Sequence, residues 1–376
     1  MQTIAYYCDA SSIEKNALEQ LDQYAQLPFV QQICAFTDIH YCSEKGLPVG
    51  TAFTAADYFY PLITGKDIGC GVMYLKISKE YWLKAFDKEA HYRALYLAHS
   101  QMTDDGLGGG NHFLSLEEDD TAVYIICHTG TRDRGIALYQ ECLQLTRDYS
   151  REHGAAVNYV HRDFVDAGFY RYYAETIAYG YQRRKNFCLK TLSFLQQANY
   201  IRCEKSAIDR NYLRQQFSGY AATGVLHGTP YQLEDAVHNH LVFDGQTTVH
   251  RKGSTELMYG KTVVIPLSMS RGSLLVTVAD KAKAAEALHS CAHGAGRQLS
   301  RFDAMKHWKT VLKAKERQAY KERFSELLNR SGEFPQGYIQ EMDFAYKSSE
   351  DTLRYQPYLR KVTATRPIVT IKYSEI

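Results

Sequence analysis

The sequence predicts a mixed fold of helices and strands that forms one large domain. Short apolar runs typical of strands, such as 72–77 and 121–127, occur between longer segments with helical spacing of apolar residues. The 376 residues are 45% hydrophobic, which is enough for a sizeable core. We find no internal repeat and no low-complexity linker, so a single domain spanning 1–376 is favoured over two.

The composition excludes several classes of protein. With 44 basic and 42 acidic residues, the formal net charge of +2 excludes a generally polycationic nucleic-acid binder but not a local basic groove. No apolar run approaches the ~20 residues that span a membrane, and residues 1–15 lack the pattern of a signal peptide. The nine cysteines show no even-spaced disulfide framework, so we expect a cytoplasmic protein whose thiols are buried or bind metal.

Two kinds of pattern place the elements along the chain. Helical spacing of apolar residues predicts helices, which in order are 11–26, 82–101, 136–217, 280–290 and 303–330. Short apolar and β-branched runs predict strands, which in order are 29–36, 72–77, 113–116, 121–127, 274–278 and 363–373. The segment 136–217 is expected to have a solvated basic face. The charged helix 303–330 is either a solvated amphipathic helix or a surface for a nucleic-acid backbone.

Polar residues gather near the ends of the first strands. We expect the first strand to end at 37–40, where Asp38 and His40 lie two positions apart and can converge on one point. A glycine-rich loop holds Asp67 and Cys70 three positions apart, a spacing that lets a carboxylate and a thiolate share one transition-metal ion. A loop with capping polar residues and a buried structural cysteine are the alternative interpretations.

Four glycines within residues 106–110 precede Asn111 and His112. A dinucleotide-binding fingerprint would need a strand before these glycines and a helix after them. Here a predicted helix precedes them and a predicted strand follows, so we reject that interpretation. The next predicted strand leads into His128, which is followed by small residues and Arg132.

Further histidines and basic residues cluster in the third quarter of the chain. His238 and His240 alternate, so on a strand they share a face, and only one of them need be a ligand. Arg251 and Lys252 precede a glycine turn. Their composition suits an anion, although a surface hairpin tip explains it equally well.

The loop 293–297, which reads His-Gly-Ala-Gly-Arg, is the stretch with the most specific chemistry. Gly294 and Gly296 allow a phosphate to approach the backbone closely. Arg297 supplies a forked cationic donor for phosphate oxygens, and His293 can attack phosphorus as a neutral imidazole. A surface turn with a solvated histidine is the alternative, and the similar loops elsewhere in the chain weigh against it.

Taken together, the loops supply the donors for two metal ions with a bridging thiolate. The donors are Asp67, Cys70, His112, His128 and His238. Two adjacent ions would neutralise phosphate charge and orient an in-line displacement. His293 would then attack the α-phosphate of a nucleotide while Arg297 and the glycine backbone hold the transferring group.

In this order, the motifs resemble those of the RtcB family of tRNA-splicing and RNA-repair ligases. The resemblance covers nearly the whole chain and rests on 38–40 with 46–50, 67–72, 108–113, 128–132, 238–239, 250–253, 265–266 with 268–269, 292–297, 341 with 345–347, and 371–372. It implies an α+β fold, in which one large domain has central mixed or antiparallel sheets flanked by helices.

The resemblance also implies a ligase that uses Mn²⁺, with two ions, and GTP. In that family a histidine is guanylylated, GMP passes to an RNA 3′-phosphate, and a 5′-hydroxyl seals the strand and releases GMP. A 2′,3′-cyclic phosphate is first opened. His293 matches the guanylylated histidine, and the five metal donors match the family's ligands, with Cys70 between the ions. Positions matching contacts with the guanine nucleotide are Asn111, His238, Asn239, Ser268, His293, Gly294, Ala295, Gly296 and Lys372. Candidates for RNA or phosphate contacts are Asp38, His40, Arg132, Arg251, Lys252 and Arg297.

The chain departs from the family pattern at several positions. Ser115 replaces an acidic residue that contacts the nucleotide, and Ser270 with Arg271 replaces a smaller, glycine-containing pair. Residues 182–184 read Gln-Arg-Arg where an Asn-Arg pair is usual, and Tyr373 replaces a glycine. These departures imply a divergent repair branch that acts on tRNA or damaged ribosomal RNA, with a release-factor-like helper as a possible partner and no membrane.

Two other functions fit the same residues. The chain could be a metal-dependent phosphoesterase that opens a cyclic phosphate without sealing, or a binding protein that has lost catalysis. His293 distinguishes the ligase from the phosphoesterase, because hydrolysis needs only metal ions whereas ligation needs a nucleotidylated side chain.

Overall fold

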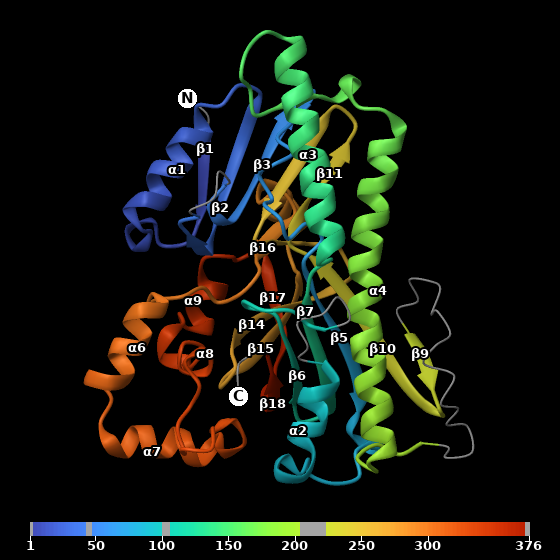
Figure 1. Ribbon diagram of the computed structural model, residues 1–376, viewed down its shortest axis with the longest axis vertical. Coiled ribbons are helices and arrows are strands. Elements are labelled where there is room, and N and C mark those ends of the chain that lie inside the picture. The colour runs from blue at the N-terminus through green and yellow to red at the C-terminus, as the bar shows by residue number, and fades with distance from the viewer. Residues whose placement is uncertain (1–2, 43–46, 100–105, 204–222, 373–376) are drawn as a thin grey trace.

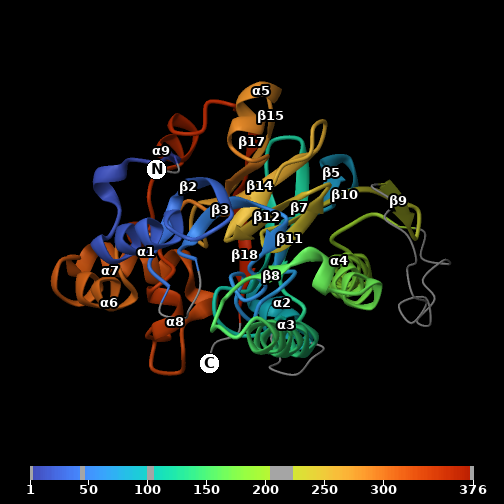
Figure 2. The same ribbon diagram turned by 90° about the horizontal axis from the view of Figure 1, so that it is seen from above.

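A computed structural model describes residues 3–42, 47–99, 106–203 and 223–372 of the protein. In this part of the chain, strands form two large and three smaller sheets at the centre, and helices lie around them (Figures 1 and 2). The predicted α+β class is confirmed. None of the helices described there is long and apolar enough to cross a lipid bilayer.

One large sheet contains the first strands of the chain. Its order is β1 (Thr3–Tyr7), β2 (Val30–His40), β3 (Val49–Ala56), β12 (Thr247–Lys252) and β11 (Asn239–Asp244). β1 pairs with β2 in parallel, and the other pairs are antiparallel. Helix α1 (Lys15–Ala25) packs Ala17 and Leu21 into a core that also contains Ile33 and Phe53 of this sheet.

The second large sheet is antiparallel throughout and is buried on both faces. Its order is β18 (Arg366–Ile371), β6 (Phe113–Glu118), β7 (Ala122–Thr129), β5 (Gly71–Ser78), β10 (Thr229–Val237) and β9 (Thr223–Leu226). Because side chains alternate along β5, Met73 and Leu75 face helix α4 (Ala167–Gln197), whereas Val72 and Tyr74 face a three-stranded sheet.

Three smaller sheets complete the β-structure. The three-stranded sheet consists of β14 (Thr262–Ser268), β15 (Gly272–Val278) and β17 (Leu359–Ala364). The two pairs are β13 (Ser254–Glu256) with β16 (Ser290–Ala292), and β4 (Tyr58–Phe59) with β8 (Val160–His161). β16 ends directly before His293 and therefore positions the loop that carries it.

The remaining helices lie outside the sheets. They are α2 (Lys88–His99), α3 (Asp133–Glu152), α5 (Lys281–Glu286), α6 (Arg301–Thr310), α7 (Ala314–Arg323), α8 (Gln336–Ile339) and α9 (Ser349–Arg354). Helices α3 and α4 pack together along one side of the molecule, whereas α6 to α8 gather at another (Figures 1 and 2).

The prediction of one long helical segment at 136–217 is wrong in its continuity and in its solvated basic face. The chain forms α3 and α4 with β8 between them. Residues 204–217 lie outside the described part of the chain. The basic residues in the middle of α4 do not lie on a solvated face, because Arg183, Arg184 and Lys185 are buried, whereas Arg171 and Lys190 are exposed. The guanidinium groups of Arg183 and Arg184 instead bond to backbone carbonyls and a carboxylate inside the protein.

The single charged helix predicted at 303–330 is also wrong, because the chain forms α6 and α7 with a break between them. The Lys313 backbone N–H donates to Glu316 Oε2 at 2.7 Å, which starts α7. The Arg317 guanidinium donates to the carbonyl of Leu312 at 2.7 Å, beyond the end of α6. These local caps divide a segment that apolar spacing alone made continuous.

The segments around the C-terminal loops differ from prediction as well. The helix predicted at 280–290 ends early because residues 288–289 have φ of 54° and 46°, so a strand rather than a helix leads to His293. The strand predicted at 363–373 is two strands, β17 and β18, and the strand predicted at 29–36 continues to the end of β2.

The other predicted elements are confirmed with shifted ends. They are 11–26 as α1, 82–101 as α2, 72–77 as β5, 113–116 as β6, 121–127 as β7 and 274–278 as β15. Gly46, residues 100–101 and Tyr373 lie outside the described part of the chain.

Candidate metal and nucleotide site

The five predicted metal donors meet at the ends of strands in the second large sheet. Asp67 and Cys70 lie on the turn before β5, His112 precedes β6, His128 is the second-to-last residue of β7, and His238 joins β10 to β11. They form two groups, Cys70 with His128 and His238, and Asp67 with Cys70 and His112. In each group the ligand atoms lie within 4.8 Å of one another, and Cys70 belongs to both.

Backbone carbonyls fix the orientation of two imidazole rings in this cluster. His112 and His128 each donate Nδ1–H to a backbone carbonyl, at 3.0 and 3.1 Å. The neutral His128 ring therefore has its lone pair on Nε2, and His112 Nε2 lies 3.2 Å from Asp67 Oδ2. Cys70 Sγ lies 3.4 and 3.2 Å from these two Nε2 atoms. His238 Nε2 is 3.3 Å from that of His128. Nitrogen and sulfur atoms held this close suit a shared cation.

Burial has a strong effect on the charges in the cluster. It lowers the pKa of His128 and His238 well below the ordinary value, so both rings are neutral and available as ligands. Burial and the adjacent Asp67 raise the pKa of the Cys70 thiol, so the thiolate needs a cation. Burial opposes ionisation of Asp67, but His112 lowers the pKa of its carboxyl to about 2. This mixture of nitrogen, sulfur and oxygen donors fits a divalent transition metal.

A buried arginine holds the backbone behind this cluster. Arg184 of α4 is fully buried and forms a bidentate ion pair with Asp235, at 2.6 and 2.8 Å. Its Nη1 donates to the carbonyls of Gly69 and Thr129, both at 2.9 Å. Arg184 therefore ties the turn that carries Cys70 to the strand end that carries His128. Sequence reasoning missed this role because the partners of Arg184 are distant along the chain.

The predicted nucleophile is held by a carboxylate from β2. Asp38 Oδ2 accepts hydrogen bonds from His293 Nδ1, from the His293 backbone N–H at 2.9 Å and from the Gly294 N–H at 3.2 Å. Burial alone would lower the pKa of His293, but Asp38 raises it above the ordinary value. Asp38, predicted as an RNA or phosphate contact, thus lies against His293. His40 lies beside it, with Nδ1 2.9 Å from the Asp38 carbonyl.

The turn after His293 requires glycine. Gly296 has a φ of 78°, and a Cβ atom on it would lie 2.6 Å from Asp38 Cα. Only glycine therefore lets the loop pack against β2. On the other side, the His293 ring centroid is 4.9 Å from that of His238, so the predicted nucleophile adjoins the predicted metal donors.

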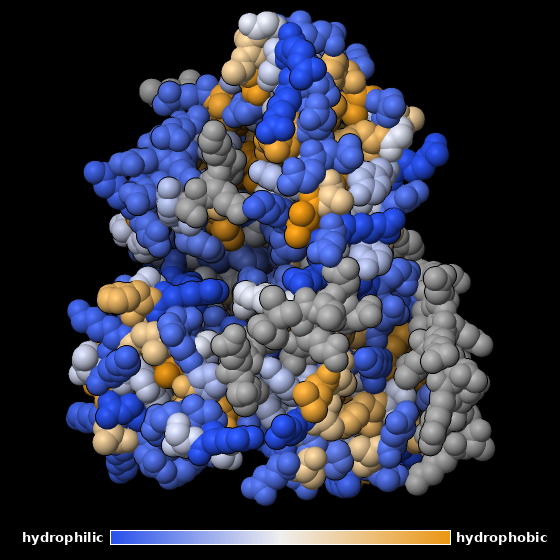
Figure 3. Space-filling model, in the orientation of Figure 1, coloured by the Kyte–Doolittle hydropathy of each residue, from blue (hydrophilic) through white to orange (hydrophobic). Residues whose placement is uncertain are grey.

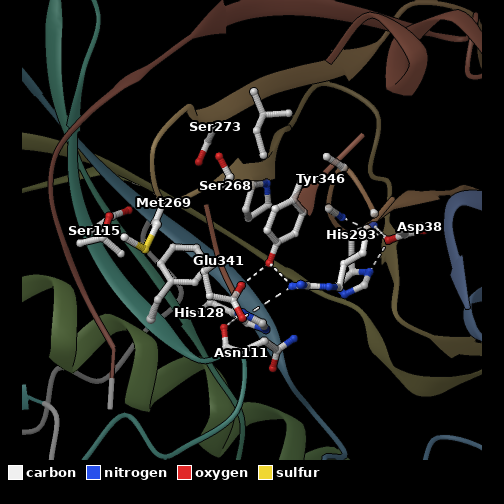
Figure 4. A pocket seen from close by; sticks show the side chains of 18 of the residues that line it. Asp38, Asn111, Ser115, His128, Ser268, Met269, Ser273, His293, Glu341 and Tyr346 are labelled. Atoms are coloured by element: carbon white, nitrogen blue, oxygen red, sulfur yellow. Dashed lines mark hydrogen bonds and ion pairs between the residues drawn. The ribbon is translucent and has the colours of Figure 1, made fainter. Parts of the chain in front are cut away.

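A cavity of about 200 Å³ connects His293 with the three-stranded sheet (Figure 4). Asp38 and His293 lie at one end, and Ser115 and Met269 lie at the other. The predicted nucleotide contacts that line it are Asn111, Ser268, His293, Gly294, Ala295, Gly296 and Lys372. The face of the molecule in Figure 3 is mainly hydrophilic and is hollowed at the level of β16.

Comparison with known proteins identifies the family. The profile described as tRNA-splicing ligase RtcB matches residues 83–373. The chain belongs to the RtcB family. The RNA-splicing ligase RtcB2 of Escherichia coli (strain ATCC 25922) is 26% identical to it over 96% of this chain and 93% of that protein. RNA-splicing ligase RtcB of Escherichia coli K12 is 25% identical, over 78% and 81%, and tRNA-splicing ligase RtcB of Nanoarchaeum equitans 26%, over 71% and 59%. The expectation of an RtcB-family RNA ligase is confirmed.

Within this RtcB-family site, two predicted nucleotide contacts do not line the cavity. His238, which is also a predicted metal donor, belongs to the cluster of candidate metal ligands. Asn239 bridges two backbone segments, because its Oδ1 accepts from Gly253 N at 2.7 Å and its Nδ2 donates to the Asp67 carbonyl at 3.4 Å. His238 also lies between strands rather than on one, so it does not share a strand face with His240, which lies 3.2 Å from Glu256 Oε2.

A carboxylate at the cavity wall gathers several cations. Glu341 Oε1 lies 3.3 Å from Lys372 Nζ, 3.8 Å from Arg297 and 3.9 Å from Arg301. The Tyr346 hydroxyl donates to the other oxygen. Glu341 belongs to one of the motifs that resemble the family, but the neighbouring residues did not predict that it pairs with these three cations. Burial lowers the pKa of Lys372, and Glu341 opposes that effect.

The remaining basic candidates occupy two different settings. Arg251 and Lys252 are buried in β12 and bond to Glu256 and to backbone carbonyls, so they form no surface hairpin tip. Their placement gives no support to phosphate binding. Arg132 precedes α3 and lies over the glycine-rich loop, because a Cβ atom on Gly108 would be 2.4 Å from its Nη1.

Proposed function

We propose that this RtcB-family ligase joins RNA 3′-phosphate or 2′,3′-cyclic phosphate ends to 5′-hydroxyl ends, using GTP and Mn²⁺. The observation that carries the proposal is a histidine oriented by a buried carboxylate, next to a five-donor metal cluster and a cavity. Hydrolysis alone would need only the cluster. The Asp38–His293 pair has the arrangement of an activated nucleophile and so favours ligation.

His293 acts through Nε2. Because Asp38 accepts a hydrogen bond from Nδ1–H, the neutral ring has its lone pair on Nε2. Attack on the α-phosphorus of GTP forms an N–P bond and breaks the bond to the β-phosphate, which leaves as pyrophosphate. The imidazolium character that develops is stabilised by Asp38.

The metal donors divide into two sets that share the thiolate. One ion would be held by Asp67, Cys70 and His112, and the other by Cys70, His128 and His238. When bound, the ions neutralise phosphate charge and orient the in-line displacement. Mn²⁺ is proposed from the resemblance to the family. The hydrogen bonds from His112 and His128 Nδ1 to backbone carbonyls fix the ring orientation that such ligands need.

The cavity would hold the guanine nucleotide. Asn111, Ser268 and Lys372 lie on its walls, and the backbone of Gly294, Ala295 and Gly296 adjoins His293 at its reactive end. An RNA 3′-phosphate oxygen then attacks the phosphorus on His293, which breaks the N–P bond and frees the ring. A 5′-hydroxyl oxygen attacks the activated 3′-phosphorus, and GMP leaves.

The arginines nearest these groups are the proposed contacts for RNA phosphate. Arg297 lines the cavity directly after the His293 loop, and Arg132 lies over the glycine-rich loop next to His112. We propose that residues 1–376 act as one cytoplasmic ligase domain. Its substrate is a tRNA or a damaged ribosomal RNA, and a release-factor-like protein is the proposed helper.

Trapping of GMP on His293 tests the proposal. Wild-type protein incubated with GTP labelled at the α-phosphate and Mn²⁺ should retain label after denaturation, and His293→Ala should not. His153→Ala, which replaces a histidine at the end of α3, serves as the matched control and should label normally. Protein that opens a 2′,3′-cyclic phosphate but never takes up label is a phosphoesterase, and the ligase proposal then fails.

A further inference from the structure

A third carboxylate, besides Asp38 and Glu341, lies on the cavity wall at the end opposite His293. Glu117 is 3% exposed and follows Phe113 and Ser115 at alternate positions of β6, so all three side chains face the cavity. None of the proposed steps uses it. A buried carboxylate in a ligand cavity requires an explanation, because burial of its charge is costly without partners.

The partners of Glu117 are hydroxyl groups. Its Oε1 accepts from Ser115 Oγ at 2.7 Å and from Ser273 Oγ at 3.2 Å, and its Oε2 accepts from Thr365 Oγ1 at 2.5 Å. Burial raises the pKa of Glu117, and these three hydroxyls oppose that effect. Because Ser115 and Ser273 donate their only hydroxyl protons to the carboxylate, their oxygens can only accept hydrogen bonds from a ligand.

Two other carboxylates line the cavity, and both are differently placed. Asp38 lies at the His293 end. Glu341 lies within 4 Å of three cationic side chains and accepts from Tyr346, so its charge is offset within the wall. Figure 4 shows Glu341 between the two ends, whereas Ser115 and Ser273 lie at the far end from His293. Glu117 is therefore the carboxylate whose charge acts on that far end.

The far end also suits a flat ring. Phe113 and Met269 contribute apolar surface there, while the hydroxyl oxygens of Ser115 and Ser273 lie on the same wall. With its α-phosphate at His293, a nucleotide would place its base among these side chains. The base would meet apolar contacts and a row of hydrogen-bond acceptors.

We propose that Glu117 determines which base the cavity accepts, by fixing Ser115 and Ser273 as acceptors that select a base edge with adjacent N–H donors. This inference rests on the proposed nucleotide function. Guanine has such an edge in N1–H and its 2-amino group. Adenine presents the lone pair of N1 beside its amino group, and hypoxanthine lacks the 2-amino group. The acidic charge that Ser115 lacks is thus supplied from two residues further along β6.

Equilibrium binding of GTP, ATP and inosine triphosphate to the full chain tests this inference. Wild-type protein should bind GTP most tightly. Glu117→Gln can donate from its amide and release the serine protons toward the ligand, so we expect the GTP-to-ATP affinity ratio to fall about 10-fold. Ser115→Ala, a smaller change, should bring GTP and inosine triphosphate closer in affinity. Glu118→Gln is the matched control, because Glu118 pairs with Lys79 at 2.9 Å and does not line the cavity.

Each outcome separates this inference from the proposed function. If Glu117→Gln and Ser115→Ala both keep the wild-type ratios, Glu117 does not select the base, even when His293 still takes up label. If the ratios change as expected but no protein takes up label, base selection stands and the ligase proposal fails. A wild-type protein that binds ATP as tightly as GTP also overturns the inference.

Discussion

Replacement of Asp38 by asparagine tests the orientation of the nucleophile. Asp38 is 2% exposed, and its Oδ2 accepts three N–H groups, two of them from the backbone of His293 and Gly294. Asparagine keeps the shape of the side chain and can keep the two backbone hydrogen bonds through its carbonyl oxygen. It removes the negative charge that holds the Nδ1 proton.

The expected loss follows from the hydrogen bond at Nδ1. A hydrogen bond to a charged group contributes roughly 1.5–3 kcal/mol, which corresponds to a labelling rate about 10- to 150-fold slower. If the amide group turns toward the ring, it donates to Nδ1 and moves the imidazole proton to Nε2, which removes the attacking lone pair. The loss would then approach the ~10⁴-fold effect of a wrong histidine tautomer.

Single-turnover uptake of α-labelled GMP at saturating GTP measures this rate. Asp148→Asn, on the exposed side of α3, is the matched control and should label at the wild-type rate. Thermal unfolding of Asp38→Asn confirms that the variant is folded. A folded Asp38→Asn protein that labels as fast as wild type would refute the role of Asp38.

Three other changes test the surroundings of the site. Cys70→Ser replaces the shared thiolate by a poor ligand, so cobalt-loaded protein should lose its sulfur-to-metal absorption; a spectrum like that of wild type would contradict the shared position. Arg184→Lys cannot make the bidentate bond to Asp235 and both carbonyl bonds, so we expect the affinity for Mn²⁺ to fall by about 10- to 100-fold. A Mn²⁺ titration measures this affinity. An unchanged affinity would contradict the role of Arg184 in holding the backbone behind the metal donors. Burial opposes ionisation of Glu256, but His240 and Arg251 lower its pKa to about 2, so its stabilising effect is present above pH 4.5 and lost toward pH 2. Glu256→Gln should therefore cost up to about 3 kcal/mol in urea unfolding at pH 7 and much less at pH 2, and an equal cost at both would argue against the ion pair.

The donor residues of the site could be predicted from the sequence because their chemistry is local. The local sequence alone indicates candidate ligands in Asp67 and Cys70, which share one glycine-rich loop, and in His128, which ends an apolar run. Their convergence depends on strands that pair over large sequence distances, as when β5 joins β7 and β10. The resemblance to a family, carried by many ordered motifs, supported the expectation that these loops form one site.

Residues whose role depends on a distant partner escaped prediction. Arg184 looked like part of a solvated basic face, but it is buried because Asp235 and two carbonyls lie behind the metal donors. Glu117 lies just beyond the strand predicted at 113–116, and its role depends on Ser273 and Thr365 from elsewhere in the chain. Apolar spacing predicts which side of an element is buried, but it does not predict which polar group from elsewhere in the chain lies against that side.

Helix ends were the least predictable part of the fold. The break between α6 and α7 depends on the backbone of Lys313 and the side chains of Glu316 and Arg317, which act over a few residues. The early end of α5 depends on two residues with positive φ that are not glycine. Both features are local, but side-chain periodicity is insensitive to them.

The mass of the intact protein after incubation with GTP and Mn²⁺ tests the central claim most directly. We predict that the protein becomes heavier by one GMP, that peptide mapping places the nucleotide on His293, and that adding RNA with a 3′-phosphate and a 5′-hydroxyl removes it as the strands are joined. Protein that binds both metal ions and GTP, yet keeps its original mass and seals no RNA, would contradict the account.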